Sequence, residues 1–507
     1  MEQKARDARH AARSGVLQLL SAIGQGLTPV THILIARLFG TATFGAYQAS
    51  VAVVDVLARA GTAGGVGGEH RFIAAHRAAG DEALARRALG TGIRLAIAVS
   101  AIIALALGLL APALARLWHD PTLAATLPIM APAVLLSAST LVLLAATLGA
   151  KVARMNLYVR GIAEPLLLLL TAVAAWRFGG GLRNLAVAHV TTSGLVAALA
   201  LAGCARVFGG AYLRAAVTAP RHPGFLRFVL PLGASDLMSA ILQRADTFIV
   251  ATFAGFDALA VYSAAEFFTR VIANPRYLFD HIVAPVIAEA LQVRDRARVR
   301  YNLALVTRWV ITASAPIAVT IIVLRAEILG LYGGAFVAGT DALVVLALVH
   351  MVTASLGLTP YVLVMAGRSR LMLVNTVAAA IVNVGLGVVL VPRLGILGAA
   401  IAVLASVASF QVALTVQTWL LERVHPFTFL LLKPLAAALV ALAAEAALHR
   451  FVPGRAARVA LVIAGGAVVY GAALLAFGLG PEERQLLKKL TSRLRSGPLA
   501  PRKRGEG

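Results

Sequence analysis

The sequence predicts an all-α integral membrane protein with about 14 transmembrane helices, arranged as two six-helix lobes followed by two C-terminal helices. The composition carries the first part of this prediction, because hydrophobic residues make up 60% of the 507 residues and charged residues only 13%. A soluble protein cannot bury that much apolar surface without exposing large apolar patches. The composition therefore excludes a soluble enzyme and a disordered chain. The single cysteine, Cys204, also excludes a disulfide scaffold.

The spans follow from the hydropathy of the chain. A helix that crosses the bilayer needs about 20 largely apolar residues, and its backbone groups must bond within the helix. The first span lacks a small-residue cleavage site after a short apolar core, so we expect it to be retained. The predicted spans are 15–38, 44–66, 92–117, 123–148, 155–176, 185–204, 225–253, 259–288, 306–324, 342–366, 371–391, 396–420, 429–449 and 459–477.

The distribution of charge predicts the orientation. The chain carries 46 Lys and Arg against 22 Asp and Glu, a net charge of +24. Basic residues of membrane proteins collect in cytoplasmic loops. With the N-terminus inside, 33 of the 46 fall in inside segments, 9 in outside loops and 4 within spans. This bias predicts that both termini are cytoplasmic, and it explains most of the positive charge without nucleic acid as a partner.

An internal repeat predicts the two lobes. The segment Phe39–Ser50 aligns with Ala254–Ala265 at an offset of 215, and in both a very short outside turn joins two helices. Duplicated halves with a site at their interface are typical of transporters. The predicted parts are a cytoplasmic N-terminus (1–14), an N-lobe with spans one to six (15–206), a cytoplasmic linker (207–224), a C-lobe with spans seven to twelve (225–421), two extra spans (429–478) and a basic cytoplasmic tail (481–507).

Two basic segments outside the spans are expected to be helical. Residues 293–300 read as a basic helical linker on the inside. Residues 482–490 follow Pro481 and read as an amphipathic helix on the membrane surface. The plainer interpretation of this tail is that its charges anchor the chain on the inside.

Polar side chains form stripes on two of the spans. On span seven, Asp236, Ser239, Gln243 and Asp246 share one helical face, and Arg244 lies next to that face. On span one, the spacing of polar residues is 4, 3, 4, 3 and 4, which also places them on one face: Ser14, Gln18, Ser21, Gln25, Thr28 and His32.

Spans two and eight each carry an acid four residues before an arginine. Asp55 and Arg59, like Glu266 and Arg270, are spaced closely enough to pair along their helix. Asn274-Pro275 is expected to kink or break span eight just before Arg276. Ionisable groups inside a membrane are costly and mark either a functional cavity or an ion pair that fixes helix packing. Both interpretations stay open for each pair.

The functional interpretation places a polar cavity between spans one, two, seven and eight. Guanidinium groups match phosphate oxygens in bidentate geometry, so arginines there would hold an anionic substrate. The glycine-rich stretch 61–68 ends a span and is expected to permit close helix approach or bending. No metal site, cofactor site or catalytic residue is expected. The predicted substrate-binding residues are Arg59, Arg244, Arg270, Arg276, Gln25, His32 and Gln243, and the predicted ion-coupling or charge-balancing residues are Asp55, Asp236, Asp246 and Glu266.

Several short runs resemble a known family. They are Ile35–Tyr47 (IARLFGTATFGAY), Phe228–Gly233 (FVLPLG), Arg244–Val250 (RADTFIV) with Gly255 and Tyr262, and Arg393–Ile401 (RLGILGAAI). In content and placement they are similar to bacterial polysaccharide flippases of the multidrug/oligosaccharidyl-lipid/polysaccharide exporter (MOP) superfamily. The resemblance covers roughly residues 14 to 490.

The resemblance implies a flippase that moves an undecaprenyl-diphosphate-linked oligosaccharide across the bacterial cytoplasmic membrane, for O-antigen, lipopolysaccharide, capsule or a similar surface polymer. It implies alternating access around a cationic cavity. The expected partners are the anionic lipid-linked substrate, membrane lipids, and a polysaccharide polymerase with its export machinery. Two alternatives remain: a drug/cation antiporter of the same superfamily, which favours an acidic cavity, and a membrane polymerase or ligase, which would need a sizeable outside domain.

Overall fold

The computed structural model describes residues 2–118, 120–293, 295–478 and 480. Side chains are described from residue 27 onward, except at several positions between 277 and 288 and at residue 369. All regular elements in these ranges are helices, as the sequence predicts. The predicted tail helix at 482–490 and the polar side chains Ser14, Gln18, Ser21 and Gln25 lie outside what is described.

The chain divides into two compact units. The first comprises residues 1–268, 329–343 and 380–405, and the second comprises 269–328, 344–379 and 406–507. The six-plus-six-plus-two division of the sequence stays a prediction. Each unit is described by itself below.

The first unit begins with the long helix α1 (Glu2–Gly61), which merges the first two predicted spans. Gly40 interrupts its regular geometry at φ 81° and ψ 172°, a conformation that only glycine adopts without strain. After α1 the chain bends by 43° into α2 (Gly65–Ala78). Ala63 and Gly64 make this bend with φ values of 46° and 77°.

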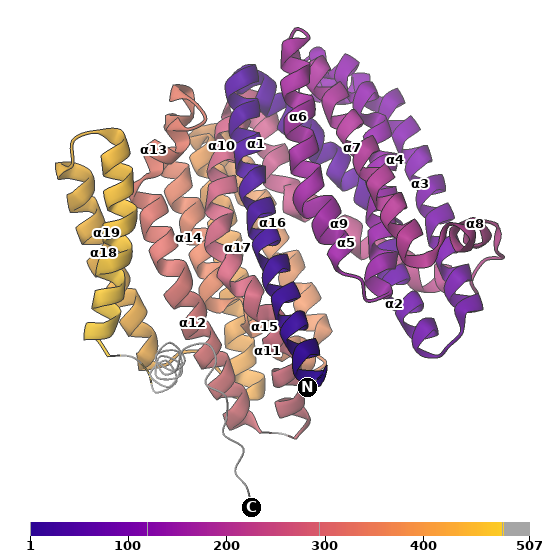
Figure 1. Ribbon diagram of the computed structural model, residues 1–507. Helices are drawn as coiled ribbons and strands as arrows, with labels where there is room; N and C mark the ends of the chain where they lie inside the picture. Colours follow the sequence, from indigo (N-terminus) through magenta and orange to yellow (C-terminus); the bar gives the residue numbers. More distant parts are fainter. Residues whose placement is uncertain (1, 119, 294, 479, 481–507) are drawn as a thin grey trace, which may run out of the picture. The chain divides into compact units, whose positions relative to one another are not determined.

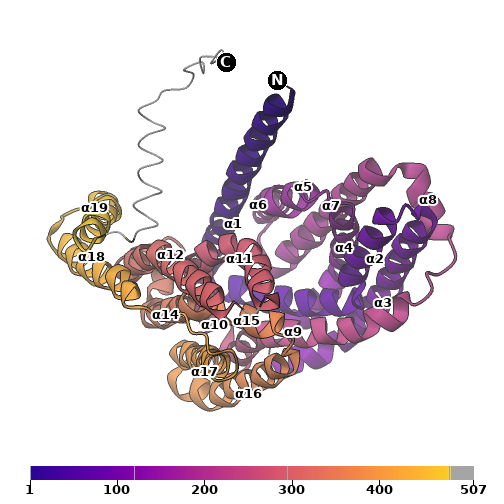
Figure 2. The same ribbon diagram turned by 90° about the horizontal axis from the view of Figure 1, so that it is seen from below.

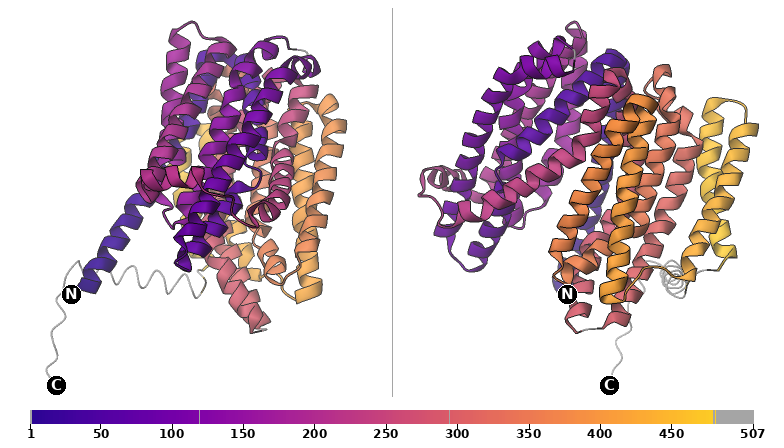
Figure 3. Two further views of the ribbon diagram at one scale, coloured as in Figure 1. Left: turned by 90° about the vertical axis from the view of Figure 1, so that its right-hand side faces the viewer. Right: turned by 180° about the vertical axis from the view of Figure 1, so that it is seen from behind.

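Six helical elements, α3 to α7 with η1, complete the predicted N-lobe within this unit, and the short helix α8 follows in the predicted linker. The Asp81 side chain caps α3 by accepting a bond of 2.8 Å from the Leu84 N–H. The fifth span contains a π-helical stretch, which is common at functional sites. The short helix α8 packs against α3 (Figure 3). The elements are α3 (Glu82–Leu117), α4 (Thr122–Gly149), α5 (Arg154–Asn156), η1 (Leu157–Ala163), α6 (Glu164–Arg177), α7 (Gly181–Phe208) and α8 (Gly210–Thr218).

The repeated segment continues the first unit. Helix α9 (Phe225–Phe253) turns into α10 (Gly255–Thr269) at Gly255, whose φ of 84° matches the 81° of its repeat counterpart Gly40. The aligned tyrosines Tyr47 and Tyr262 are both buried. The two halves of the repeat thus turn with the same local geometry. The 3-10 helix η3 (Gly334–Gly339) also belongs to this unit.

The second unit contains most of the remaining helices. Its core at the end of the chain packs α12 against the hairpin of α18 and α19, drawn in yellow in Figure 1. Helices α11 and α12 lie side by side in the view of Figure 2. The elements are η2 (Arg270–Ala273), α11 (Asn274–Gln292), α12 (Arg296–Val323), α13 (Arg325–Gly330), α14 (Thr340–Leu356), α15 (Thr359–Met365), α16 (Ser369–Leu394), α17 (Ile396–Glu422), η4 (Phe429–Leu431), α18 (Leu432–Phe451) and α19 (Arg455–Ala476). Helices α14, α16 and α17 each run from one unit into the other.

Eleven helices in the described residues are long and apolar enough to cross a membrane, or up to twelve if the bent pair of residues 27–61 and 65–78 counts as one span. The predicted eighth span is not among them. The 3-10 turn η2 interrupts this span, and the span carries the charged residues Glu266, Arg270 and Arg276. The structure therefore supports an all-helical multi-pass membrane protein, and the count of fourteen stays a prediction.

Candidate functional site

The first unit brings two oppositely charged side chains together across helices α1 and α9. Nη2 of Arg244 donates to Oδ2 of Asp55 at 2.5 Å. The Arg244 side chain keeps 29% of its surface exposed and the Asp55 side chain 46%. Each group therefore has surface with which it can contact another ligand.

The same two helices carry a second arginine and a second carboxylate, which interact through their charges. The charge of Arg59 on α1 acts on the carboxylate of Asp236 on α9. Arg59 is exposed and Asp236 is half-buried. Asp55 precedes Arg59 on α1, whereas its partner Arg244 comes after Asp236 on α9. The two helices are therefore antiparallel here. We call the four residues Asp55, Arg59, Asp236 and Arg244 the α1–α9 cluster.

The helical spacing allows Asp55 to pair with Arg59, but the structure shows a different ion pair. The ion pair of Asp55 is with Arg244, from the neighbouring helix. Pairs four residues apart on a helix contribute only about 0.2–0.5 kcal/mol, so a well-placed guanidinium from a packed helix displaces them. Arg244, expected only beside the polar face of span seven, is the residue that reaches α1.

Glycines allow α9 to approach the bend between α1 and α2. A Cβ atom on Gly64 would lie 2.0 Å from the carbonyl oxygen of Val229, and one on Gly233 would lie 2.6 Å from the carbonyl carbon of Ala63. No residue with a side chain fits at either position without moving the backbone. The glycine-rich stretch therefore provides both the bend and the close approach that the sequence predicts. Both features let α1 and α9 pack closely near the residues of the α1–α9 cluster.

Two other predicted residues are held by protein groups near this region. The Asp246 carboxylate is buried and accepts bonds from the hydroxyl of Tyr262 at 2.7 Å and from the Thr247 N–H at 2.9 Å. The His32 ring lies 4.7 Å from the Phe267 ring and 6.1 Å from the Phe44 ring, measured between centroids. These contacts give Asp246 and His32 a part in packing α1, α9 and α10 together.

The remaining predicted residues of the first unit differ in exposure. Gln243 is exposed on α9, directly before Arg244. Glu266 of α10 is half-buried. The side chain of Gln25 lies outside the described residues. Gln243 is therefore accessible to a ligand beside Arg244.

Arg270 and Arg276 lie in the second unit. That they form one binding site with the α1–α9 cluster stays a prediction. Arg270 is exposed at the start of η2. Arg276 is half-buried, and its Nη1 donates to the carbonyl oxygen of Gly357 at 3.1 Å. The 3-10 turn η2 ends immediately before Asn274-Pro275, so the predicted break in this helix is confirmed. The bond to Gly357 ties Arg276 to the turn between α14 and α15.

The first unit contains a buried carboxyl group that was not predicted from the sequence. Glu69 of α2 is fully buried, and neither of its carboxyl oxygens has a hydrogen-bond partner among the described residues. It packs against Gly92 of α3, where a Cβ atom would lie 1.9 Å from Oε1. Glu69 was missed because it follows the predicted end of span two. A glycine on a facing helix is the feature that makes room for it, and sequence alone does not show which helices face each other.

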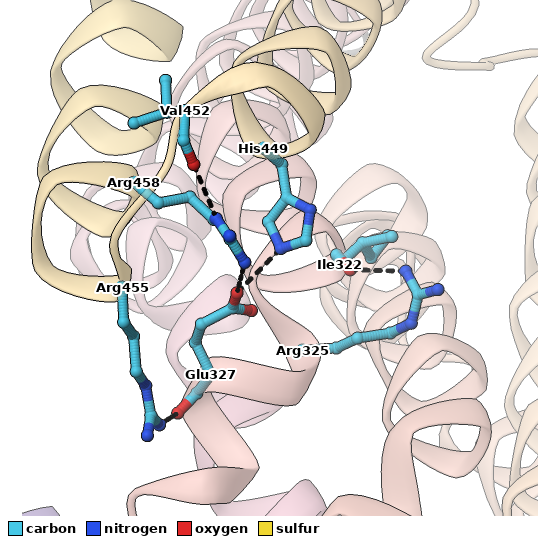
Figure 4. A network of polar contacts seen from close by, with 7 residues as sticks. All are labelled: Ile322, Arg325, Glu327, His449, Val452, Arg455 and Arg458. Atoms are coloured by element: carbon cyan, nitrogen blue, oxygen red, sulfur yellow. Dashed lines mark hydrogen bonds and ion pairs between the residues drawn. The ribbon is translucent and has the colours of Figure 1, made fainter.

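The second unit contains a denser polar network, shown in Figure 4. Oε1 of Glu327 accepts bonds from Nε2 of His449 at 2.8 Å and Nη1 of Arg458 at 3.4 Å, and its carbonyl oxygen accepts from Nη2 of Arg455 at 2.9 Å. The Glu327 side chain is only 11% exposed. Burial by itself raises the pKa of Glu327, but bonds from its own backbone N–H, His449 and Arg458 outweigh it and hold the pKa below its ordinary value. We call Glu327, His449, Arg455 and Arg458 the hairpin network, because they join α13 to the α18–α19 hairpin.

The comparisons with known proteins agree with this arrangement of helices. A model of the polysaccharide biosynthesis protein family matches residues 11–290, more than half of the chain. Among solved structures, the chain is similar to the lipid II flippase MurJ in an inward closed conformation, with a TM-score of 0.72 and 13% identity over 93% of this chain and 99% of that chain. A search among curated protein sequences finds no match.

Two further solved structures are similar. One is an inward-facing multidrug resistance MATE family transporter of the MOP superfamily, with a TM-score of 0.64 and 17% identity over 79% of this chain and 94% of that chain. The other is a MOP superfamily transporter from Pyrococcus furiosus, with a TM-score of 0.57 and 15% identity over 80% and 94%. At these identities the likeness concerns the fold.

Fold and family together define the class: a helical membrane protein of a polysaccharide biosynthesis family, with a fold like that of MurJ and of MATE transporters of the MOP superfamily. Within that class, the chain belongs to the polysaccharide biosynthesis protein family. The resemblance seen in the sequence is thereby confirmed.

Proposed function

We propose that the protein flips an undecaprenyl-diphosphate-linked oligosaccharide from the inner to the outer leaflet of the bacterial cytoplasmic membrane, in the synthesis of a surface polysaccharide such as O-antigen. In this proposal the chain has fourteen spans with both termini in the cytoplasm. Two six-helix lobes alternate access to a cavity between them, and the last two spans are additional to the lobes. A polymerase and export machinery take the product onward.

The observation that carries the proposal is the half-exposed α1–α9 cluster. A diphosphate carries charge that must be balanced where it leaves water. Arg244 and Arg59 are guanidinium groups, which bind phosphate oxygens in bidentate geometry. Their carboxylate partners, Asp55 and Asp236, neutralise them when no substrate is bound. Substrate phosphate then replaces a carboxylate as the partner of each arginine, and the carboxylate recovers the arginine on release.

The other predicted site residues extend this cluster. Gln243 next to Arg244 offers an amide that can bond sugar hydroxyls, and Arg270 adds a third guanidinium. Arg276 is engaged with Gly357 and would first have to release that carbonyl. Glu266 is a further carboxylate for charge balance, and the buried Asp246 would first have to release Tyr262 and Thr247. These roles rest on residue chemistry and on the exposure of the side chains.

The drug/cation antiporter stays as the second candidate, since the chain is also similar in fold to MATE transporters. A cavity for organic cations favours carboxylates without matching arginines. Here each carboxylate of the α1–α9 cluster faces an arginine, which favours an anionic substrate. The family match to polysaccharide biosynthesis proteins also favours the flippase.

Reconstitution separates the two candidates. The purified chain in proteoliposomes is given a polyprenyl-diphosphate oligosaccharide labelled on the sugar, and label reaching the opposite leaflet is measured. A fluorescent organic cation is offered in a parallel preparation. The proposal expects transfer of the lipid-linked sugar and none of the cation. Transfer of the cation alone would establish the antiporter instead.

A further inference from the structure

The second unit contains an amphiphilic cavity that the proposed function does not use. Its volume is about 680 Å³, and it is lined by α12, the end of α14, the segment 423–428, η4 and the start of α18. The segment 423–428 has no regular secondary structure and joins α17 to η4. Within the described residues, the cavity therefore lies where the α18–α19 hairpin begins.

The cavity has an apolar wall. Ile311 of α12, Leu356 of α14 and Leu431 of η4 form its inner part. Phe427 and Phe429 stand at its rim with 53% and 90% of their surface exposed. Aromatic and aliphatic groups exposed on a membrane helix contact lipid chains. An apolar chain of a lipid therefore has a continuous path from the rim into the cavity.

The cavity also has a polar end, formed by Arg300 of α12 and His425. No described residue pairs with Arg300, whereas its neighbour Arg298 is paired with Glu289 at 3.1 Å. The Nδ1 atom of His425 is buried and has no hydrogen-bond partner among the described residues. The nearby Arg423 lies with its guanidinium 6.0 Å from the Trp419 ring. The lining thus contains one guanidinium whose bonding capacity is unused, together with the half-buried imidazole of His425.

We infer that this cavity binds an anionic phospholipid of the surrounding bilayer, with its phosphate on Arg300 and His425 and one acyl chain along Phe427, Phe429 and Leu431. A basic group beside an apolar pocket between membrane helices matches the two ends of such a lipid. The lipid is distinct from the transported substrate. It fills the space between α12 and the start of α18, and so stabilises the attachment of the hairpin.

The test measures retention of dioleoylphosphatidylglycerol by the full chain in detergent, using native mass spectrometry, with dioleoylphosphatidylcholine as the zwitterionic comparison. Wild type is expected to retain phosphatidylglycerol over phosphatidylcholine. Arg300→Ala should weaken phosphatidylglycerol binding about fivefold, the share expected of one basic residue. Arg370→Ala is the matched control, since it removes an exposed arginine of the same unit that does not line the cavity.

A second variant tests the chain-binding part without changing charge. Ser355→Phe places a ring in the cavity, and it should lower retention of both lipids. Equal retention by Arg300→Ala and Arg370→Ala, or equal retention of the two lipids by wild type, would overturn the inference. So would competition by a polyprenyl diphosphate at this cavity with no binding of phosphatidylglycerol, because the cavity would then belong to the substrate.

Discussion

Two charged sites of this protein use the same residue types in opposite ways. In the α1–α9 cluster, a single arginine meets a single carboxylate, and both side chains stay substantially exposed. In the hairpin network, the Glu327 side chain is 11% exposed and its carboxylate bonds two basic side chains, while the backbone carbonyl of the same residue bonds a third. The first arrangement leaves guanidinium surface for a ligand, and the second uses the charge to hold helices together.

The difference shows why charge inside a membrane protein does not by itself identify a binding site. Glu327 can be read as a potential site residue from its surroundings of basic residues, yet its bonds are directed at α18 and α19 (Figure 4). Arg244 has one partner and spare surface. We therefore expect changes in the cluster to affect transport, and changes in the network to affect stability.

The largest effect is expected from removing cluster arginines. Arg59→Ala should reduce transport at least tenfold, since a guanidinium–phosphate contact contributes about 1.5–3 kcal/mol. Arg270→Ala is expected to do the same, because Arg270 is the third guanidinium of the proposed substrate site. The measurement is restoration of surface polysaccharide in a deletion strain, with Arg116→Ala as the control for an exposed arginine at the end of α3. Full restoration by both alanine variants would refute the cationic cavity.

Next in size is the close approach of α9 to the bend. Gly64→Ala introduces a Cβ atom at a positive φ and against the Val229 carbonyl, so we expect both transport and thermal stability to fall, with a stability loss of about 2 kcal/mol. Gly108→Ala is the control, because a Cβ atom there meets no atom within 4 Å. It should leave the protein as stable or slightly more stable. An unchanged melting temperature in Gly64→Ala would show that the backbone yields at the bend.

The hairpin network should respond in stability and not in transport. Glu327→Gln removes the charge that His449 and Arg458 contact, and a loss of about 2 kcal/mol is expected. Glu82→Gln is the control, since its pair with Arg77 is largely exposed and should contribute less than about 1 kcal/mol. Thermal unfolding in detergent measures both. If Glu327→Gln abolished transport in a stable protein, the assignment of the two sites would be reversed.

The smallest effect concerns pH. The pKa of Glu327 is lower in the folded protein than its ordinary value, so its contribution is complete above about pH 4.3 and is lost as the pH falls through the folded pKa. The difference in melting temperature between wild type and Glu327→Gln should therefore shrink as the pH is lowered from 6 to 3. A difference that grew over this range would show that the carboxylate is stabilised in its protonated form.

Much of the architecture was predictable because it depends on local sequence. The lengths of the apolar segments predicted the helices. Gly40 and Gly255 marked equivalent turns, since each adopts a positive φ seven residues before a buried tyrosine. The glycine stretch before α2 signalled a bend for the same reason. Charge bias predicted an orientation, which no contact in the structure tests.

The pairing of charges was not predictable from spacing. Asp55 and Arg59 satisfy the helical rule, yet the partner of Asp55 comes from α9, since pairing depends on how two helices are rotated against each other. The burial of Glu69 could not be predicted for the same reason, because the glycine that makes room for it, Gly92, lies on another helix. The sequence identified the candidate residues, but only the folded structure shows which residues they pair with.

The central claim is that substrate phosphate replaces Asp55 as the partner of Arg244. The direct measurement is equilibrium binding of a polyprenyl diphosphate to the purified chain, in an Arg300→Ala background to exclude the cavity of the second unit. We predict that Asp55→Asn binds about fivefold more tightly than wild type, because a competing carboxylate is removed, and that Arg244→Ala binds at least tenfold more weakly. Equal affinity of all three proteins would show that the Asp55–Arg244 pair only fixes helix packing, and would contradict the account.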